Sequence, residues 1–235
     1  MGNVSTGVIP IDKLLDGGLE DDIITAIYGP SSSGKTNIAI ISAINIILSG
    51  KKAIYMDTEG GLSFERIRQI AKNKFDDVLK NIYLFQPVNF QEQKRDIYNI
   101  YKHVKERKEE IGIIIIDSIS MLYRLERGDQ EVREVNMELA KQLQILAEIA
   151  RRYKIPVLVT NQVYSPFDER EKIEIVGGDL IRYWSKCLIE LRVIGEGVRV
   201  ALLRKHRHLP EGRSVKFIIT NDGIEEYKEE KEELF

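Results

Sequence analysis

Gly29-Pro30-Ser31-Ser32-Ser33-Gly34-Lys35-Thr36 is the stretch of sequence that decides the fold. It matches the pattern G-x-x-x-x-G-K-[ST], in which a glycine-rich loop holds phosphate groups. The apolar run Ile23–Tyr28 before it predicts a strand, and the apolar run Lys35–Leu48 after it predicts a helix. A strand, this loop and a helix in that order are the setting in which the pattern binds phosphate. We therefore expect a nucleotide site here, rather than a Ser/Gly-rich turn that only looks like one.

Each residue type in the loop has a chemical reason to be there. Glycines let backbone N–H groups approach phosphate oxygens closely, because no Cβ stands in the way. The helix that begins near Lys35 directs its free amides and the positive end of its dipole at the same anion. We expect Lys35 to neutralise the β- and γ-phosphates of ATP, and the Thr36 hydroxyl to bind Mg²⁺. The expected nucleotide contacts are Gly29, Pro30, Ser31, Ser32, Ser33, Gly34, Lys35 and Thr36.

Strand-like and helical segments alternate along most of the chain. Ile113-Ile114-Ile115-Ile116 is an unbroken β-branched run, typical of a strand buried on both faces of a parallel sheet. The alternation predicts an α/β fold with a mostly parallel central sheet flanked by helices. Further strands are expected at Ala53–Asp57, Ile82–Phe85 and Pro156–Asn161, and helices at Phe64–Lys72, Gln91–Arg107 and Glu131–Arg152.

The pattern changes after Asp179. Cys187–Val193 and Val198–Arg204 are strand-like, and the four residues between them predict a hairpin. Val215–Thr220 follows as another strand, so we expect antiparallel strands toward the C-terminus. We expect one domain over residues 1–235, with a charged tail at 225–235 that forms a solvated helix or a frayed end.

Composition limits the class of protein. The 235 residues carry 35 Lys and Arg against 37 Asp and Glu, so the molecule is not a polycation, and nucleic-acid contact would depend on local basic patches. A single cysteine, Cys187, excludes an internal disulfide and a cysteine-based zinc site. The sequence shows no secretory signal and no run of about 20 apolar residues that would cross a bilayer. A soluble, cytoplasmic protein is expected.

Two acidic residues are candidates for the chemistry of hydrolysis. Asp117 ends the isoleucine strand, where a carboxylate can hold the Mg²⁺ shell; the alternative is a helix cap or turn. Ser118 follows it, although many ATPases place a water-activating glutamate there. Glu59 lies in Asp57-Thr58-Glu59-Gly60-Gly61, the segment that ends the strand after the P-loop helix, and carboxyl ends of strands share one edge of such a sheet. Glu59 is therefore the candidate that orients water and accepts its proton, the alternative being a surface loop glutamate.

Several motifs in the same order resemble the core of the RecA/RadA recombinase family. They comprise the N-terminal segment Ser5-Thr6-Gly7…Asp12-Lys13-Leu14-Leu15-Asp16-Gly17-Gly18-Leu19, the P-loop, Asp57-Thr58-Glu59-Gly60, Phe64-Glu65-Arg66, Asp117-Ser118, Thr160-Asn161-Gln162-Val163 and Gly177-Gly178. The resemblance covers essentially the whole chain. It implies a RecA-like P-loop ATPase core in which Glu59 activates water, Arg66 stacks on adenine and Gln162 senses the γ-phosphate.

The departures from that family also carry information. Only Met1, Gly2, Asn3 and Val4 precede the N-terminal segment, so we expect neither the family's N-terminal helical domain nor the linker that builds filaments. In this respect the chain is most similar to the archaeal RadB paralogues, which resemble recombination accessory factors. We therefore do not expect efficient strand exchange, and a homo-oligomer remains possible.

DNA contact is expected at two loops that the resemblance marks and at one basic stretch. Acidic neighbours in the second loop favour a solvated loop as strongly as a DNA contact. The basic stretch could bind phosphates, or reach the ATP of a neighbouring subunit, or be an exposed turn; its histidines would add charge only below about pH 6.5. The residues are Arg124 and Arg127 in the first loop, Arg170 and Lys172 in the second, and Lys205, His206 and Arg207 in the stretch.

The sequence thus predicts an ATP- and DNA-binding accessory protein of homologous recombination and DNA repair. Its Mg²⁺-dependent ATP hydrolysis is expected to be weak and DNA-dependent, with single-stranded DNA preferred and a recombinase or replication protein as partner. Two alternatives stay open: a regulatory partner that does not hydrolyse ATP, and a P-loop kinase of a small molecule.

Overall fold

The computed structural model describes residues 2–126, 132–164 and 174–228 of the chain. Its strands are β1 (Asn3–Val4), β2 (Leu19–Glu20), β3 (Ile24–Gly29), β4 (Lys52–Asp57), β5 (Ile82–Phe85), β6 (Ile111–Asp117), β7 (Val157–Tyr164), β8 (Glu174–Ile175), β9 (Ser185–Val193), β10 (Val198–Lys205), β11 (Ser214–Thr220) and β12 (Gly223–Glu226). Its α-helices are α1 (Ile9–Leu14), α2 (Lys35–Leu48), α3 (Phe64–Ala71), α4 (Phe75–Lys80), α5 (Phe90–Arg107), α6 (Met121–Glu126), α7 (Val132–Tyr153) and α8 (Gly178–Trp184).

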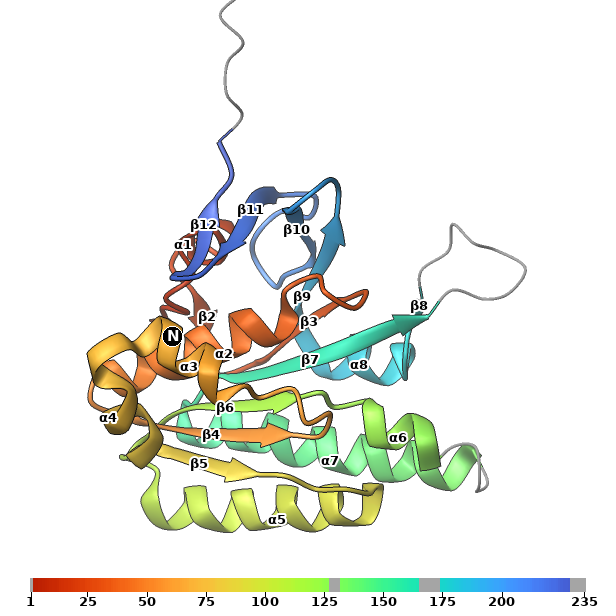
Figure 1. Cartoon of the computed structure of the whole chain (residues 1–235). Coiled ribbons are helices and arrows are strands. Elements are labelled where there is room, and N and C mark those ends of the chain that lie inside the picture. Colours follow the sequence, from red (N-terminus) through yellow and green to blue (C-terminus); the bar gives the residue numbers. More distant parts are fainter. Residues whose placement is uncertain (1, 127–131, 165–173, 229–235) are drawn as a thin grey trace, which may run out of the picture.

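One large sheet organises the described part of the chain (Figure 1). Its strand order is β12-β11-β10-β9-β3-β7-β6-β4-β5, and β8 pairs with β7. The strands from β9 to β5 run parallel to one another, whereas β10, β11 and β12 continue the sheet antiparallel. The expected α/β architecture, with antiparallel strands toward the C-terminus, is therefore confirmed.

Helices cover both faces of the sheet and enclose two apolar cores. The isoleucine strand β6 shows the arrangement, because its side chains alternate between the faces. Ile113 and Ile115 pack in the core beneath α1, α2 and α3, whereas Ile114 and Ile116 pack in the core beneath α5, α7 and α8. All four side chains are buried, which explains why the run shows no polar alternation.

The N-terminal segment packs beside the C-terminal strands. Strands β1 and β2 pair antiparallel, and α1 lies against β10, β11 and β12. An ion pair joins Arg213 to Asp16, with a shortest N–O distance of 2.5 Å. Another joins Lys13 to Glu226. The two ends of the described chain are therefore held together.

The expected tail is wrong at its beginning. Glu225 and Glu226 belong to β12, where they pair with Ile218 and Phe217 of β11. Edge pairing of this kind satisfies backbone groups without requiring apolar side chains, so the charged sequence did not reveal it. Residues 229–235 lie outside the described residues. Among the helices that are described, none combines the length and the apolar character needed to span a bilayer.

Candidate nucleotide-binding site

The ends of four parallel strands bring the expected site residues together. Gly29 ends β3 and Gln162 lies beside it in β7; Asp57 ends β4 and lies beside Asp117, the end of β6. Because these strands run in the same direction, their carboxyl ends share one edge of the sheet, which is where ligands bind in folds of this type. Residues far apart in sequence therefore meet at the start of α2.

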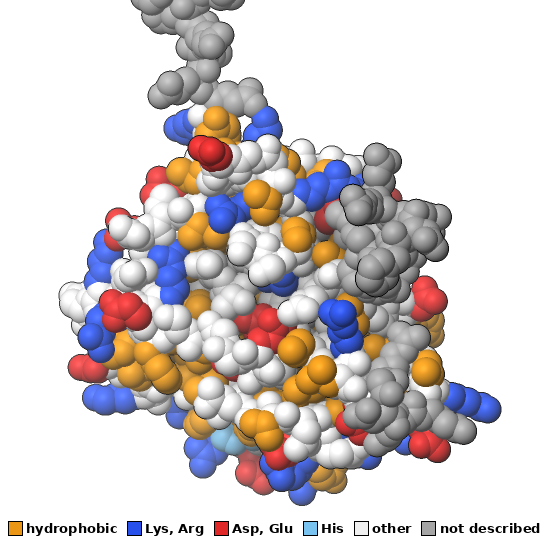
Figure 2. Space-filling model, turned by 45° about the vertical axis from the view of Figure 1, so that its right-hand side comes forward, with side chains coloured by type: hydrophobic (Ala, Val, Ile, Leu, Met, Phe, Trp, Pro, Cys, Tyr) orange, Lys and Arg blue, Asp and Glu red, His pale blue; other side chains and the backbone are white. Residues whose placement is uncertain are grey.

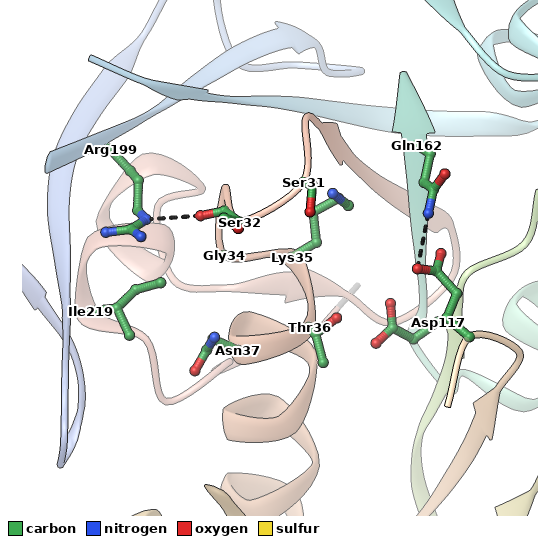
Figure 3. A pocket seen from close by; sticks show the side chains of 11 residues that line it. Ser31, Ser32, Gly34, Lys35, Thr36, Asn37, Asp117, Gln162, Arg199 and Ile219 are labelled. Atoms are coloured by element: carbon green, nitrogen blue, oxygen red, sulfur yellow. Dashed lines mark hydrogen bonds between the residues drawn. The ribbon is translucent and has the colours of Figure 1, made fainter. Parts of the chain in front are cut away.

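A cavity of about 460 Å³ opens at this edge (Figure 3). It contains the P-loop, the two acidic residues expected from the sequence, and side chains from β7, β10 and β11. The lining residues are Ser31, Ser32, Gly34, Lys35, Thr36, Asn37, Glu59, Asp117, Gln162, Arg199 and Ile219. The structure thus brings Glu59, Asp117, Gln162 and most of the P-loop into one pocket.

Two glycines of the P-loop are required by its geometry. Gly34 caps α2 with φ at +105°, a backbone conformation that favours glycine. At Gly29 an added Cβ would lie 2.5 Å from the carbonyl oxygen of Leu191, so a larger residue would force β3 and β9 apart. The loop therefore keeps its backbone close to the pocket and exposes the first amides of α2 to it.

Lys35 lies inside the loop with its ammonium group on backbone carbonyls. Its Nζ donates hydrogen bonds to the oxygens of Gly29 at 2.9 Å and Pro30 at 2.8 Å. Burial lowers the pKa of Lys35, while the negative charges of Glu59 and Asp117 oppose that shift. The ammonium group therefore has neutral carbonyl oxygens as its hydrogen-bond partners in this structure.

Asp117 is a buried carboxylate fixed on both of its oxygens. The Tyr55 hydroxyl donates to Oδ2 at 2.8 Å, and the Thr160 hydroxyl donates to Oδ1. Burial raises the pKa of Asp117, and the hydrogen bonds from Thr160, Tyr55 and Thr36 oppose the rise. The alternative of a helix cap or turn does not describe this position, because the side chain faces the pocket and its hydroxyl partners.

Glu59 and Gln162 touch each other across the pocket. The Gln162 amide Nε2 donates to Glu59 Oε2 at 2.9 Å. Asp57 shapes the loop that carries Glu59, because its carboxylate accepts the backbone N–H groups of Glu59, Gly61 and Leu62 at 3.0–3.2 Å. The acidic and amide side chains expected from the resemblance are therefore in direct contact, on neighbouring parts of the sheet edge.

The donor set suits a magnesium nucleotide. The Thr36 hydroxyl and the Asp117 carboxylate supply the oxygen ligands that Mg²⁺ prefers. The Ser33 Oγ is buried and has no hydrogen-bond partner among the described residues. A phosphate oxygen in the loop would provide the acceptor that this hydroxyl lacks.

Arg66 lies outside the pocket lining. Its guanidinium donates to Asn37 Oδ1 at 2.7 Å and to the backbone oxygens of Asn221 and Gly223 at 2.9 and 3.1 Å. It links α3 to the turn between β11 and β12 and directly contacts Asn37, which lines the pocket. These hydrogen bonds use the edge of the guanidinium and leave its face available, so a stack on adenine stays a prediction.

Sequence reasoning missed three residues that line the pocket: Arg199, Ile219 and Asn37. Asn37 directly follows the P-loop motif and could have been included from its position alone. Arg199 and Ile219 come from β10 and β11, which reach the P-loop only because β9 pairs with β3. Nothing in their local sequence distinguishes them from other strand residues.

The two loops expected at DNA are only partly described. Arg124 is exposed on α6, after the strand that ends at Asp117. Arg127, Arg170 and Lys172 lie outside the described residues. On the visible face, Lys and Arg side chains are scattered among acidic and uncharged ones rather than gathered in a single patch (Figure 2).

The cations of the basic stretch already have partners within the molecule. Arg207 Nε lies 2.6 Å from Glu20 Oε2, and Arg207 Nη2 lies 2.6 Å from Asp22 Oδ1. Lys205 Nζ donates to the backbone oxygens of Arg182 and Ser185 at 2.5 and 2.9 Å. These residues lie at the opposite edge of the sheet from the P-loop, because β10 runs antiparallel to β9. Contact with DNA or with a neighbouring subunit's ATP therefore stays a prediction for them, and it requires these partners to be exchanged.

His206 corrects one expectation. Its imidazole is buried, and this burial lowers the pKa of His206 to about 4. The expected gain of positive charge below about pH 6.5 is therefore wrong for this residue. His208, which is exposed, lies beside Glu20, with its Nδ1 3.1 Å from Oε1.

Glu20, His206 and His208 also place three possible ligand atoms within 4.8 Å of one another. They do not fit a cation site. The Nδ1 of His206 accepts the backbone N–H of Leu209 at 3.2 Å, which leaves the proton of the neutral ring on Nε2, the atom facing Glu20. Arg207 already neutralises the carboxylate. This cluster joins the N-terminal segment to the end of β10.

Replacing Arg207 with Ala should destabilise the fold. Glu20 is almost fully buried, and removing its partner leaves an uncompensated charge in the interior. We expect the free energy of unfolding to fall by about 3 kcal/mol, measured by urea denaturation at pH 7.

Arg213→Ala is the matched control for this change. It removes an arginine that also pairs with an N-terminal acid, Asp16, but that acid is exposed. Its loss of stability should be clearly smaller. Equal losses in the two variants would show that burial of Glu20 does not set the cost.

Comparison with known proteins identifies relatives of this chain in sequence and in structure. The sequence model of the Rad51 family matches residues 1–227. A protein of Methanobrevibacter smithii described as DNA repair and recombination protein RadB is 42% identical over 217 residues, 91% of this chain and 92% of the relative. The RadB protein of Methanosphaera stadtmanae is 46% identical over 216 residues, with the same coverage, 91% and 92%. A crystal structure of the RadB recombinase has a TM-score of 0.79 and 38% identity, over 95% of this chain and 99% of that one. The resemblance drawn from the motifs is confirmed.

Proposed function

The chain belongs to the Rad51 family, and from this membership we propose that it is a RadB-type accessory protein of DNA recombination and repair. It binds ATP with Mg²⁺ and hydrolyses it slowly. It binds DNA, single-stranded DNA in preference, and acts in the cytoplasm beside a recombinase or replication protein. It does not build the long filaments of a strand-exchange enzyme.

One observation supports the nucleotide part of this proposal above all others. The contact between Glu59 and Gln162 lies in the same cavity as Lys35, Thr36 and Asp117. A pocket that only held phosphate would need the last three residues alone. In the proposed complex, the carboxylate of Glu59 and the amide of Gln162 would lie beside the terminal phosphate of ATP.

Each of these residues has a separate role in the proposed hydrolysis. Lys35 and the amides at the start of α2 bind the phosphate oxygens and stabilise the charge that develops on them. Asp117 and Thr36 would hold Mg²⁺, which would supply further positive charge to the phosphates. Glu59 orients a water molecule and accepts its proton, while Gln162 holds the Glu59 carboxylate and contacts the terminal phosphate.

DNA is assigned to the loops that follow Asp117 and Gln162. Arg124, Arg127, Arg170 and Lys172 would contact phosphates there, and salt would weaken the binding. Arg66 would stack on adenine with its planar guanidinium. Lys205, His206 and Arg207 would take part only after leaving their present partners.

The rate of ATP hydrolysis, measured alone, with single-stranded DNA and with double-stranded DNA, tests the proposal alongside the mass in solution. We expect a low basal rate that single-stranded DNA raises more than double-stranded DNA does, and a mass far below that of a filament. Tight ATP binding with no turnover under any of these conditions would favour the non-hydrolysing regulatory partner. Turnover that needs a small phosphate acceptor and ignores DNA would favour the kinase.

A further inference from the structure

Arg199 reaches the pocket from outside the parallel strands. It is the second residue of β10, directly after the hairpin that joins β9 to β10. Its Nε donates to the carbonyl oxygen of Ser32 in the P-loop at 3.2 Å, and its Nη1 donates to the oxygen of Gly197 at 2.7 Å. Within the described parts of the chain it has no acidic partner. A full positive charge thus lies over the P-loop with only carbonyl groups around it.

The pocket has two distinct ends, and Arg199 lies at one of them (Figure 3). Arg199, Ile219 and Asn37 are at one end, Gln162 and Asp117 are at the other, and the start of α2 lies between them. The proposed function puts the terminal phosphate beside Glu59 and Gln162. The Arg199 end then receives the part of the nucleotide that lies farthest from the terminal phosphate.

Ile219 supports this orientation of the nucleotide. Its Cδ1 would lie 3.3 Å from a Cβ placed on Gly34, so it touches the P-loop directly. An aliphatic side chain suits the sugar and base of a nucleotide better than it suits a phosphate. A cation and an apolar surface side by side fit the junction between the phosphates and the nucleoside.

We propose that Arg199 is a further nucleotide-binding residue, whose guanidinium leaves the Ser32 carbonyl and donates to the α-phosphate of the bound nucleotide. The carbonyl of Ser32 is a neutral acceptor, and an α-phosphate oxygen is an anionic one, which makes the stronger hydrogen bond. Since ADP and ATP share the α-phosphate, the contact contributes equally to both. It takes no part in the transfer of the terminal phosphate. This assignment rests on the proposed function.

Nucleotide titrations of the full chain carrying Arg199→Ala test the proposal. Loss of one charge-assisted hydrogen bond should raise the Kd for ADP and for ATP by the same factor, about tenfold. The kcat for hydrolysis at saturating ATP should stay at the wild-type value, since uniform binding affects KM and not kcat. Arg199→Lys should recover part of the lost affinity, because it keeps the charge without the fork geometry.

Arg192→Ala is the matched control. Arg192 lies on β9, opposite Val200 of β10, and pairs with Glu190 instead of the P-loop. It removes the same charge from the same hairpin, so its Kd values should equal those of the wild type. A similar rise in Kd for this variant would show a general effect of charge and overturn the assignment.

The outcomes separate this assignment from the proposed function. An unchanged Kd for ADP in Arg199→Ala, or a fall in kcat with unchanged Kd, overturns the role of Arg199 alone. Wild-type protein that binds neither nucleotide overturns the proposed function and the assignment together. Thermal denaturation of each variant shows whether a loss of binding comes from a loss of folded protein.

Discussion

Replacing Lys35 with Ala should raise the Kd for ATP by at least about 100-fold. The ammonium group is already directed at the backbone of the P-loop, on the oxygens of Gly29 and Pro30, so its position is set before nucleotide arrives. The variant loses charge-assisted hydrogen bonds to the β- and γ-phosphates, each of which contributes about 1.5–3 kcal/mol. Calorimetric titration with ATP and ADP measures the effect.

Lys72→Ala is the control for the loss of a lysine. Lys72 is exposed and pairs with Asp222, away from the pocket. Its Kd for ATP should match that of the wild type. If Lys35→Ala also bound ATP with nearly wild-type affinity, the loop at residues 29–36 would not be the phosphate site.

Replacing Glu59 with Gln should remove hydrolysis while leaving nucleotide binding intact. The amide has nearly the size of the carboxylate and can still accept a hydrogen bond from Gln162, so the pocket keeps its shape. It cannot accept a proton from water, and the loss of a general base lowers kcat by about 10²–10⁴. Phosphate release and the Kd for ATP are the two measurements.

Glu65→Gln is the control for Glu59→Gln, because it also replaces a glutamate with glutamine and removes one negative charge. Glu65 is exposed in the first turn of α3, a few residues after Glu59. Its hydrolysis rate should not change. A wild-type rate in Glu59→Gln would assign the activation of water to another group, and a raised Kd would give Glu59 a part in binding instead.

Much of the fold follows from local sequence. Helix α2 begins and ends at the expected residues, because the glycine of the P-loop starts it at Lys35 and Ser49-Gly50 follow its last turn. Strand β5 also has its expected bounds, Ile82–Phe85. Apolar periodicity identifies such elements because each buries its own side chains.

The sequence pattern does not predict the short elements that lack strong apolar periodicity. The helix α4 at Phe75–Lys80 follows a brief 3₁₀ turn and buries only Val78, and the pair β1 and β2 has two residues in each strand. Strand β12 is half acidic. Each of these forms because of what it packs or pairs with, and that information lies elsewhere in the chain.

The residues of the candidate site also differ in whether local sequence or distant partners place them. The expected residues lie at or soon after the ends of strands that the sequence identifies, and parallel order brings these ends together. They are Lys35, Thr36, Glu59, Asp117 and Gln162. Arg199 and Ile219 depend on which strand lies beside β3. The basic stretch shows the reverse case: its charges are evident in the sequence, but Glu20 and Asp22, which neutralise Arg207, are about 185 residues away.

The place of β3 in the sheet has a consequence for how the protein is made. The ribosome produces β3 early, yet its neighbours are β7 and β9, which end at Tyr164 and Val193. Until both have emerged, the backbone edges and apolar side chains of β3 are exposed to solvent. The P-loop then lacks the neighbouring strands that support it. Folding is therefore completed after most of translation, through contacts of long sequence separation that form slowly. A nascent chain stopped before β9 would leave apolar surface and an unpaired strand exposed, which promotes aggregation.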